Sequence, residues 1–578
     1  MCGIYGVVAR GDAPLQRPEA GAAMGARLRH RGPDGQREWR GPHALLGATR
    51  LRIQDLTAAG DQPFTDTAAG VVLVANGEIY NAPELRKRFD PYPFRSRSDV
   101  EVILPLYLAG GAHALTDLHG MFALALWDSR HGSLVLARDR AGEKPLFRAQ
   151  VGDELWFASE IAALLTHPRL SRELDQTSLV RYLTLGFIQP PGTMLAGVRS
   201  VEPGTVEVHR CGRSLVHRYW DPFQEPRRDG STDQAVTEGR RLLAAAVQRQ
   251  ARAEVPVGVF ASGGLDSSLV AALAAPHVPG GLTLFTAAVQ AAGYDESAHA
   301  AALGRHLGAR TVVVTVNDAS LCQAYQAMRT ISAEPLADPA VLPTFLLARE
   351  ARKSVGVILS GEGADELFGG YPAYLGHRLA RLYVLLPTPV RRRIGATLGR
   401  GAVSHGKVPL AWLGRLFAQS AHLPWLERHI RWIGTDLPPD IMACGSRAGA
   451  ADLGWAAAGE PDAVQAAMQF DYRGYLGNRL LPKLDRATMA VGLEGRAPFL
   501  DADVTRFAWS WPAHRHVRGL TTKWLLKRVA AAHVPRRHIH RRKRGLSVPI
   551  ATWLNGGFRQ ELDRLLDPAR LRREGVFS

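Results

Sequence analysis

The sequence is poor in cysteine and has no long apolar run. Its 578 residues include four cysteines, none of them in a CxxC pair and none with histidine neighbours at metal-ligand spacing. A disulfide framework and a zinc site are therefore not expected, and a reducing cytoplasm is the compartment that fits best. No apolar stretch reaches the roughly 20 residues of a membrane-spanning helix, and no signal-peptide pattern opens the chain. We expect a cytoplasmic protein without a membrane span.

Positive charge is in excess. Lys and Arg number 71 against 54 Asp and Glu, which gives a formal net charge of +17. Such an excess favours contact with nucleic acid or with a membrane surface. The basic residues are spread along the chain apart from a run over 536–544. A biased composition produces diffuse charge of the same kind, so nucleic-acid binding is not expected to be the main function.

The first 220 residues are predicted to be rich in β-structure. Runs of β-branched and aromatic residues, separated by Gly, Pro and Asp, lie at 71–80, 122–128, 133–139 and 154–160. Helical patterns interrupt them at 83–90 and 98–109, and Ser98 with Asp99 can cap the second helix.

A polar segment rich in Asp, Pro and Gly, residues 221–233, reads as a linker. After it, helical stretches alternate with short apolar strands at 255–261, 282–289, 311–316 and 354–360. This alternation predicts a parallel sheet covered by helices, and the final third of the chain is predicted to be mostly helical. Because the chain is too long for one core, we predict two domains, 1–220 and 234–578.

The stretch SGGLDSS, residues 262–268, follows an apolar strand and precedes a helix. Glycines let the backbone approach a phosphate, and a helix start offers free N–H groups and a positive dipole end. Asp266 supplies a carboxylate for the Mg²⁺ that accompanies a polyphosphate. No GK[ST] follows, so this is not a Walker loop. An ordinary strand-to-helix turn is the alternative, and the full motif favours phosphate binding.

A second strand–loop–helix crossing contains SGEGADE, residues 360–366. Glu362, Asp365 and Glu366 place three carboxylates within five residues, and such groups usually share a cation or a proton. The carboxyl end of a parallel strand is where α/β sheets bind ligands. A solvated acidic helix start is the alternative reading.

These motifs, together with others along the chain, resemble those of the glutamine-hydrolysing asparagine synthetases, whose synthetase half is an ATP pyrophosphatase of the PP-loop type. The stretches that carry the resemblance are MCGIYG (1–6), HRGPDG (30–35), RLRIQDL (50–56), NGEIYN (76–81), SRSDVEVIL (96–104), LHGMFALALWD (118–128), RDRAGEKPLF (138–147), FASEIAALL (157–165), SGGLDSS, SGEGADELFGGY (360–371), LPKLDRATMAVGLEGRAPFLD (481–501) and RRKRGLSVP (541–549). The resemblance implies a two-domain fold. Residues 1–220 would form a four-layer αββα sandwich of antiparallel sheets, like other Ntn hydrolases. Residues 234–578 would form an α/β domain with a parallel sheet and a mostly helical last part.

Cys2 alone is ambiguous, because it can be a thiol of a buried strand or, once Met1 is removed, a nucleophile at the amino terminus. The resemblance implies the second role: attack on the side-chain amide of glutamine, with the free α-amine as a built-in base. It also implies an oxyanion hole from Asn76 and Gly77. Further residues of the glutamine pocket would be Arg50 for the α-carboxylate, Asp99 for the α-ammonium group, and Glu78.

In the synthetase half the resemblance implies an ATP site, a pair of carboxylates that bind Mg²⁺, and two further catalytic groups. The residues matched to ATP are Phe260, Ser262, Gly263, Gly264, Asp266, Ser267, Ser268, Val289, Ser360 and Gly361. Asp266 and Asp365 match ligands of Mg²⁺. Glu362 matches the base that takes a proton from the attacking ammonia, and Lys543 matches a lysine that stabilises the phosphates.

The implied reaction joins ammonia from glutamine to a carboxylate that ATP has activated as an acyl-adenylate, with the ammonia travelling through the protein interior. Aspartate is the expected acceptor. A sugar acid of surface polysaccharides, or a peptide or natural-product precursor, is the alternative, and Asn478 and Arg479 depart from the acidic residues of many relatives. The expected partners are small molecules, with ATP as substrate, Mg²⁺, no tightly bound organic cofactor, and a possible homodimer.

Overall fold

The amino-terminal part of the protein is built on two antiparallel sheets. The computed structural model describes residues 2–11, 13–291, 293–398, 410–435, 462–541 and 548–577. The first sheet has the order β10 (Val198–Ser200), β8 (Phe147–Val151), β9 (Glu154–Ala158), β1 (Cys2–Ala9), β3 (Ala44–Arg50), β2 (Gly35–Arg40). The second has the order β12 (Arg213–Arg218), β11 (Thr205–Arg210), β7 (Ser133–Arg138), β6 (Gly120–Asp128), β5 (Val71–Ile79), β4 (Phe64–Asp66). The strands predicted at 71–80, 122–128, 133–139 and 154–160 are thus confirmed.

Side-chain alternation along β5 explains why the two sheets stack. Val72 and Val74 point into a core shared with Ile4 and Leu46 of the first sheet, whereas Leu73 belongs to a core on the opposite face of β5. A strand with both faces buried needs apolar residues at consecutive positions, and VVLVA supplies them.

Helices cover both outer faces of this sandwich. On the first sheet lie α1 (Ala20–Leu28) and α4 (Ile161–Leu164), and on the second lie α2 (Ala82–Arg88) and α3 (Ile103–Ala114). The result is the expected order of helix, sheet, sheet and helix layers. A further helix, α5 (Gln176–Leu185), follows.

The predicted cap at Ser98 is wrong. The Ser98 side chain makes no capping hydrogen bond, and residues Asp99–Val102 form a 3₁₀ turn before α3. Asp99 turns inward instead, and its Oδ2 accepts a hydrogen bond from the backbone N of Ile79 at 2.6 Å. The Asp99 carboxylate, which could have capped the helix, accepts a hydrogen bond from β5 instead.

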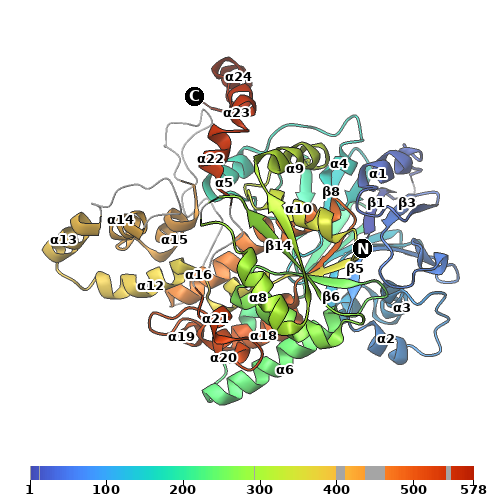
Figure 1. Ribbon diagram of the computed structural model, residues 1–578. Helices are drawn as coiled ribbons and strands as arrows, with labels where there is room; N and C mark the ends of the chain where they lie inside the picture. The colour runs from blue at the N-terminus through green and yellow to red at the C-terminus, as the bar shows by residue number, and fades with distance from the viewer. Residues whose placement is uncertain are drawn as a thin grey trace.

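A five-stranded parallel sheet forms the centre of the remaining chain (Figure 1). Its order is β15 (Arg310–Val316), β14 (Thr283–Val289), β13 (Val257–Phe260), β16 (Val357–Leu359), β17 (Glu494–Arg496). The predicted parallel sheet is confirmed. The chain leaves β13 toward β14 and β15 and later returns to β16 on the other side, so the strand order reverses between β13 and β16. Ligands of open α/β sheets bind at the carboxyl ends of strands at such a reversal.

Helices pack on both faces of the parallel sheet and continue to the end of the chain. One face carries α6 (Thr232–Gln250) and α7 (Leu265–Ala274), and the other carries α9 (Asp318–Ile331) and α10 (Val341–Ala351). The other helices are α8 (Ser297–Leu307), α11 (Ala364–Phe368), α12 (Pro372–Tyr383), α13 (Thr388–Leu398), α14 (Leu410–Ser420), α15 (Trp425–Ile433), α16 (Ala463–Asp471), α17 (Leu481–Met489), α18 (Ala502–Ser510), α19 (Ala513–His516), α20 (Trp524–Ala530), α21 (Arg536–Ile539), α22 (Ile550–Asn555), α23 (Arg559–Leu565) and α24 (Pro568–Glu574), with a π-helix at Tyr472–Leu480 before α17. The mostly helical last third is confirmed.

Figure 1 shows the sandwich and the helical extension at opposite sides of the molecule, with the parallel sheet between them. Helices α12, α13 and α14 extend away from the body as an arm, and α15 packs against the body beside them. Across the described ranges, no helix is both long enough and apolar enough to cross a bilayer.

Candidate active sites

Cys2 lies at the start of β1, in the interior of the first sheet. It pairs with Arg50 of β3 in the antiparallel ladder, and only 4% of its surface is exposed. The backbone N of Cys2 donates to Oδ1 of Asn76 at 3.1 Å, and Nε2 of Gln62 lies 3.5 Å from Sγ. Burial raises the pKa of the Cys2 thiol, while a hydrogen bond from the Leu51 backbone opposes the rise. The thiol therefore needs a base to become a nucleophile at neutral pH.

Asn76 and Gly77 lie in β5, on the sheet that faces Cys2. The side chain of Asn76 is fully buried, and its Nδ2 has no hydrogen-bond partner among the described residues. A buried amide donor without a partner is costly and indicates a place for an acceptor atom. Gly77 has φ +158°, and a Cβ there would lie 2.1 Å from the carbonyl O of Met121. No side chain fits at this position, so the backbone passes close to the neighbouring strand.

The guanidinium group of Arg50 is fixed by acceptors from the loop that follows β3. Nη1 donates to the carbonyl O of Thr57 at 2.6 Å and to Oδ1 of Asp61 at 2.5 Å, and Nη2 donates to the carbonyl O of Asp55. A Cβ on Gly60 would lie 2.2 Å from Nη2, so glycine at 60 leaves room for the guanidinium. The cation is thus held rigidly one strand away from Cys2.

Asp99 and Glu78 bring two buried carboxylates to the same region. Burial raises the pKa of Asp99 to about 6, and the hydrogen bond from Ile79 N opposes this rise. Burial also raises the pKa of Glu78 well above its ordinary value; the negative charge of Asp99 adds to the rise and Arg496 opposes it. Glu78 Oε2 lies 3.3 Å from Nη2 of Arg496, and Arg496 Nε donates to Glu494 at 2.6 Å. Both partners belong to β17 of the parallel sheet, so the group of residues around Cys2 is tied to the second half of the protein.

The SGGLDSS loop leaves β13 and folds over the start of α7. Ser267 Oγ accepts from Ser262 N at 3.2 Å, and Ser262 Oγ accepts from Gly264 N at 3.3 Å. Gly263 has φ +69°, and a Cβ there would lie 2.6 Å from the carbonyl carbon of His299. The turn therefore requires glycine for its backbone angle and for space.

Lys523 joins the two carboxylates that the sequence assigns to a metal. Its Nζ lies 2.6 Å from Oδ2 of Asp266 and 2.6 Å from Oδ1 of Asp365. Burial lowers the pKa of Lys523, but the two carboxylates outweigh it and raise the pKa above its ordinary value. Asp266 follows β13 and Asp365 follows β16, so the strand reversal brings together motifs about a hundred residues apart.

The three carboxylates of SGEGADE have three separate partners. Asp365 pairs with Lys523, Glu362 Oε1 lies 2.8 Å from Nζ of Lys483, and Glu366 accepts from the hydroxyl of Tyr371 at 2.5 Å. Burial lowers the pKa of Lys483, and the charges of Glu362 and Asp338 reverse this and raise it. Each carboxylate thus contacts a different side chain, and the expectation that they share a cation or a proton stays a prediction.

A cavity of about 360 Å³ opens where these groups meet. Nine of the twelve residues predicted to bind ATP or metal or to act as the base line this cavity. Those that line it are Phe260, Ser262, Gly264, Asp266, Ser267, Ser360, Gly361, Glu362 and Asp365. Gly263, Ser268 and Val289 are outside the lining: Gly263 is at the outer turn, the Ser268 hydroxyl is buried, and Val289 packs in the core below the sheet.

Lys523 is the residue that the motif reading missed. Lys543, which was predicted to contact the phosphates, lies outside the described residues. Lys523 directly precedes α20, in TTKWLLK, and a lysine before a short helix is normally a surface residue. Its backbone φ of +52° and its buried position have no local sequence signal, so only the fold reveals its contact with both carboxylates.

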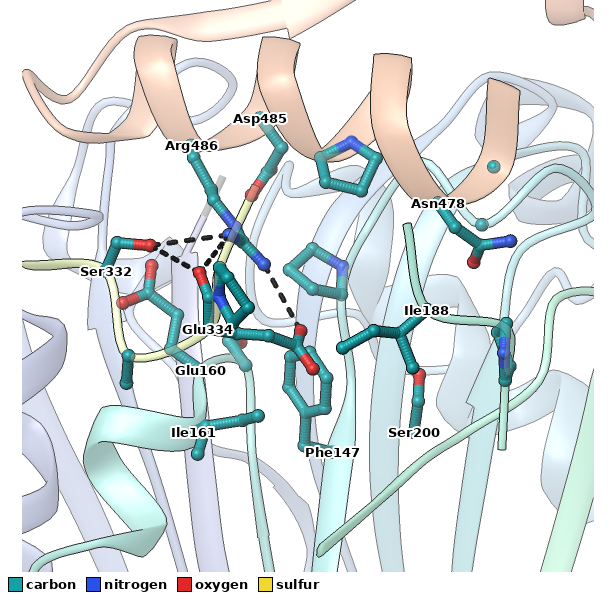
Figure 2. A pocket seen from close by; sticks show the side chains of 18 of the residues that line it. Phe147, Glu160, Ile161, Ile188, Ser200, Ser332, Glu334, Asn478, Asp485 and Arg486 are labelled. Carbon is teal, nitrogen blue, oxygen red and sulfur yellow. Dashed lines mark hydrogen bonds and ion pairs between the residues drawn. The ribbon is translucent and has the colours of Figure 1, made fainter. Parts of the chain in front are cut away.

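A second, smaller cavity of about 80 Å³ lies between the two halves, and its lining includes none of the predicted site residues. Figure 2 shows Arg486 of α17 reaching toward Ser332 and Glu334, above Phe147 and Ile161 of the amino-terminal part. Arg486 Nη1 donates to the Glu334 carbonyl O at 2.7 Å. Asn478 also lines this cavity, so that departure from the family pattern lies between the two halves of the chain.

A buried bidentate ion pair joins the two halves of the protein. Arg31, which is fully buried, donates from Nη1 and Nη2 to the two carboxylate oxygens of Asp485 at 2.8 and 2.9 Å, and Nη1 also contacts Glu160 at 2.8 Å. Two parallel hydrogen bonds of this kind fix the orientation of both groups.

Comparisons with known proteins agree with this architecture. Residues 238–578 match the asparagine synthase family, and residues 1–220 match the glutamine amidotransferase domain. The chain belongs to the asparagine synthase family. The resemblance drawn from the motifs is therefore confirmed, as is an enzyme of the glutamine-dependent amidotransferase type.

Three relatives illustrate the range of similarity. A protein of Mycobacterium tuberculosis H37Rv named putative asparagine synthetase (glutamine-hydrolyzing) is 36% identical over 96% of this chain and 89% of its own. Asparagine synthetase (glutamine-hydrolyzing) 1 of Bacillus subtilis is 30% identical over 96% and 88%. A Gibberella zeae protein named amidase chry2 is 27% identical over 95% and 88%. Proteins with different names are thus similar to this chain over nearly its whole length.

Proposed function

We propose that the protein forms an amide from a carboxylate, with ammonia that it takes from glutamine and ATP as the activating substrate, and that aspartate is the acceptor. The observation that carries the proposal is the convergence of Asp266 and Asp365 on Lys523 at the edge of a cavity that Glu362 also lines. A phosphate loop, a cation and a carboxylate base in one cavity are what adenylation followed by attack of ammonia requires.

Glutamine would be hydrolysed at Cys2 after removal of Met1. The new α-amine, held by Asn76 Oδ1, takes the thiol proton, and Sγ attacks the side-chain amide to form a thioester with release of ammonia. The free Nδ2 of Asn76 and the backbone N–H of Gly77 would stabilise the oxyanion. Arg50 and Asp99 would hold the α-carboxylate and the α-ammonium group, and Glu78 would complete the pocket.

In the synthetase cavity the acceptor carboxylate attacks the α-phosphorus of ATP, and pyrophosphate leaves. Ser262, Gly264 and Ser267 would donate to the phosphates, and Lys523 would balance their charge; Lys543 stays a further prediction for this role. Ammonia then attacks the acyl carbon, AMP leaves with the electron pair of the broken C–O bond, and Glu362 takes the surplus proton. Lys483 Nζ lies 2.8 Å from Oε1 of Glu362 and fixes the position of that carboxylate in the cavity.

Asp266 and Asp365 would hold Mg²⁺. The fit rests on their geometry, because both carboxylates reach one ammonium group at 2.6 Å and so can share one cation. Mg²⁺ in nucleotide sites uses one or two carboxylates together with phosphate oxygens, and it neutralises the phosphate charge. Among the described residues no cluster of three or more potential metal ligands occurs, and this pair is the donor set that suits the ion.

The interior between the two sites suits passage of ammonia. Leu51, Ile53 and Met121 of the amino-terminal part share a core with Leu480 and Met489 of the synthetase part. An apolar passage keeps ammonia unprotonated, whereas water would convert most of it to ammonium at neutral pH.

The test is pyrophosphate release from purified protein with free Cys2, supplied with glutamine, ATP, Mg²⁺ and aspartate. We expect pyrophosphate and glutamate in equal amounts, and asparagine as product. A rate that does not change when aspartate is omitted would exclude aspartate as acceptor and leave a sugar acid, or a peptide or natural-product precursor, as the candidate. Absence of both glutaminase and pyrophosphate release would contradict the proposal as a whole.

A further inference from the structure

The helical arm lies within a segment of the sequence that has no acidic residue. Between Glu366 and Glu427, residues 367–426 contain seven Arg and one Lys and no Asp or Glu, a formal charge of +8. The whole chain has a net charge of +17, so about a tenth of its length carries almost half of the excess. Folding of the active sites does not require this bias, because none of the predicted site residues lies in the segment.

The arm is a three-helix unit with its own small core. Helices α12, α13 and α14 pack around Ala380, Tyr383 and Ala421, with Ile394 and Phe417 against them. The rings of Tyr383 and Phe417 meet edge to face with centroids 5.2 Å apart. Figure 1 shows the unit standing away from both sheets. Leu382 and Leu385 lie outside this core and line an open hollow together with Val464 and Val517 of the body.

A basic pocket of about 640 Å³ lies between α13 and α14. Arg391, Arg392, Arg415 and His422 line it, and no acidic residue does. Nη2 of Arg391 donates to Oγ1 of Thr388 at 3.1 Å, while its Nε is buried without a partner among the described residues. No described carboxylate pairs with Arg392 or Arg415 either. Several guanidinium groups around an open space without a counter-charge form a site for a phosphate-bearing anion.

Large apolar side chains are also exposed on the arm. Leu382 at the end of α12 is 64% exposed, Leu385 in the next turn 78%, Val390 of α13 43% and Trp412 of α14 45%. Val390 directly precedes the three consecutive arginines 391–393. Exposed leucine and tryptophan next to arginine is the composition of surfaces that enter the boundary between lipid headgroups and acyl chains.

We propose that α12, α13 and α14 form a docking surface for a bilayer that contains anionic lipids. The basic pocket receives a headgroup phosphate, and Leu382, Leu385 and Trp412 enter the interface. A nucleic acid would satisfy the arginines but would leave these apolar side chains in water, so the observations favour a membrane.

Vesicle flotation with the full-length protein tests the proposal. We expect the protein to float with vesicles made of equal parts of phosphatidylcholine and phosphatidylglycerol and to stay behind with phosphatidylcholine alone. Each basic residue near an anionic surface contributes about fivefold to the partition coefficient. Combined Arg391→Glu, Arg392→Glu and Arg393→Glu should therefore lower it by about 100-fold or more.

A matched variant distinguishes the effect of the arginines on the arm from the effect of net charge on vesicle binding. Arg199, Arg210 and Arg213 are exposed on the sandwich, and combined replacement by Glu changes the net charge by the same amount. This control should keep nearly full binding to the vesicles, and both variants should keep glutaminase activity, which shows that they fold. Equal loss of flotation in the two variants would overturn the proposal, since binding would then follow net charge alone.

A serine variant tests the role of the exposed apolar side chains. Leu385→Ser with Trp412→Ser should weaken flotation by at least about tenfold and leave binding to a random DNA duplex unchanged. If the serine variant floats like the parent and the Arg391–Arg393 variant loses DNA binding, the surface is a nucleic-acid site and the proposal is wrong. If inorganic phosphate alone raises thermal stability and vesicles do not bind, the pocket serves a free anion and the proposal is equally wrong.

Discussion

Glu78 and Arg496 form an ion pair across the boundary of the two halves, with Oε2 and Nη2 3.3 Å apart and both side chains almost fully buried. Glu78 lies near the end of β5, and Arg496 ends β17 of the parallel sheet. Arg496 also donates to the carbonyl O of Gln250 at 2.7 Å. The residues proposed to bind glutamine are therefore tied to the synthetase half by a buried ion pair.

Removal of the cation should cost much of the protein's stability. In Arg496→Met, Glu78 and Glu494 stay buried without their positive partner, which typically costs about 3 to 5 kcal/mol. We expect a large drop in the urea midpoint, measured by intrinsic fluorescence, together with weaker glutamine binding. Arg249→Met is the control, because Arg249 pairs with Asp501 within the synthetase half and is partly exposed. A loss for Arg496→Met no greater than for this control would contradict the role of the pair.

The local parts of the sites could be predicted from the sequence. In SGGLDSS and SGEGADE the strand end, the glycine turn and the helix start are contiguous in the sequence, so the motif itself predicts the local backbone structure. The sequence pattern of β5, apolar at consecutive positions, likewise predicts a strand buried on both faces.

Contacts between distant segments could not be predicted in this way. Lys523 and Asp266 are 257 residues apart, and nothing in TTKWLLK distinguishes a buried lysine from an exposed one. Asp99 shows the same limit, because a helix-capping pattern was overridden by a hydrogen bond to β5. The protein uses long-range contacts where charge must be balanced, and local motifs where the backbone must turn.

Glutamine use should depend on the ionisation of Asp99. Its pKa is raised to about 6 by burial, and only the charged carboxylate can pair with the α-ammonium group of glutamine. Below pH 6 the logarithm of kcat/KM for glutamine should therefore fall by one further unit per pH unit, beyond the fall due to protonation of the α-amine. Asp99→Asn should lower kcat/KM strongly and remove this extra slope. Asp117→Asn, at an exposed surface pair with Arg88, is the control and should keep the slope.

The same shift has the opposite effect on stability. Because the folded state keeps the Asp99 proton to a higher pH than the unfolded chain, this group stabilises the fold most below about pH 4. The contribution is lost as pH rises to about 6. Urea midpoints of the parent should therefore decline over this window relative to Asp99→Asn. A parallel course for the two proteins would show that Asp99 titrates normally.

Replacement of Lys523 should separate the two reactions. In Lys523→Met, Asp266 and Asp365 lose the cation that lies 2.6 Å from each, and the phosphates lose a balancing charge. Pyrophosphate release should fall by about 100-fold or more, while glutamine hydrolysis continues. Lys527→Met, one turn further along α20 and also in the cavity lining, should have a smaller effect because Lys527 forms no ion pair with either carboxylate. Equal losses in the two variants would show that only the general charge of the cavity matters.

Exchange of the nitrogen source tests the division of labour between the halves. Cys2→Ala removes the nucleophile, so glutamine should give no product, yet ammonium salts at high pH should still support amide formation because the synthetase cavity is intact. Asp266→Ala should do the converse, stopping pyrophosphate release while glutamine is still hydrolysed. Both are followed by coupled assays of glutamate and pyrophosphate on the same preparation. Suppose that Cys2→Ala loses ammonia-dependent synthesis while its urea midpoint is unchanged. Cys2 would then serve the synthetase reaction directly, because replacing a buried thiol by a methyl group does not by itself change the distant synthetase cavity.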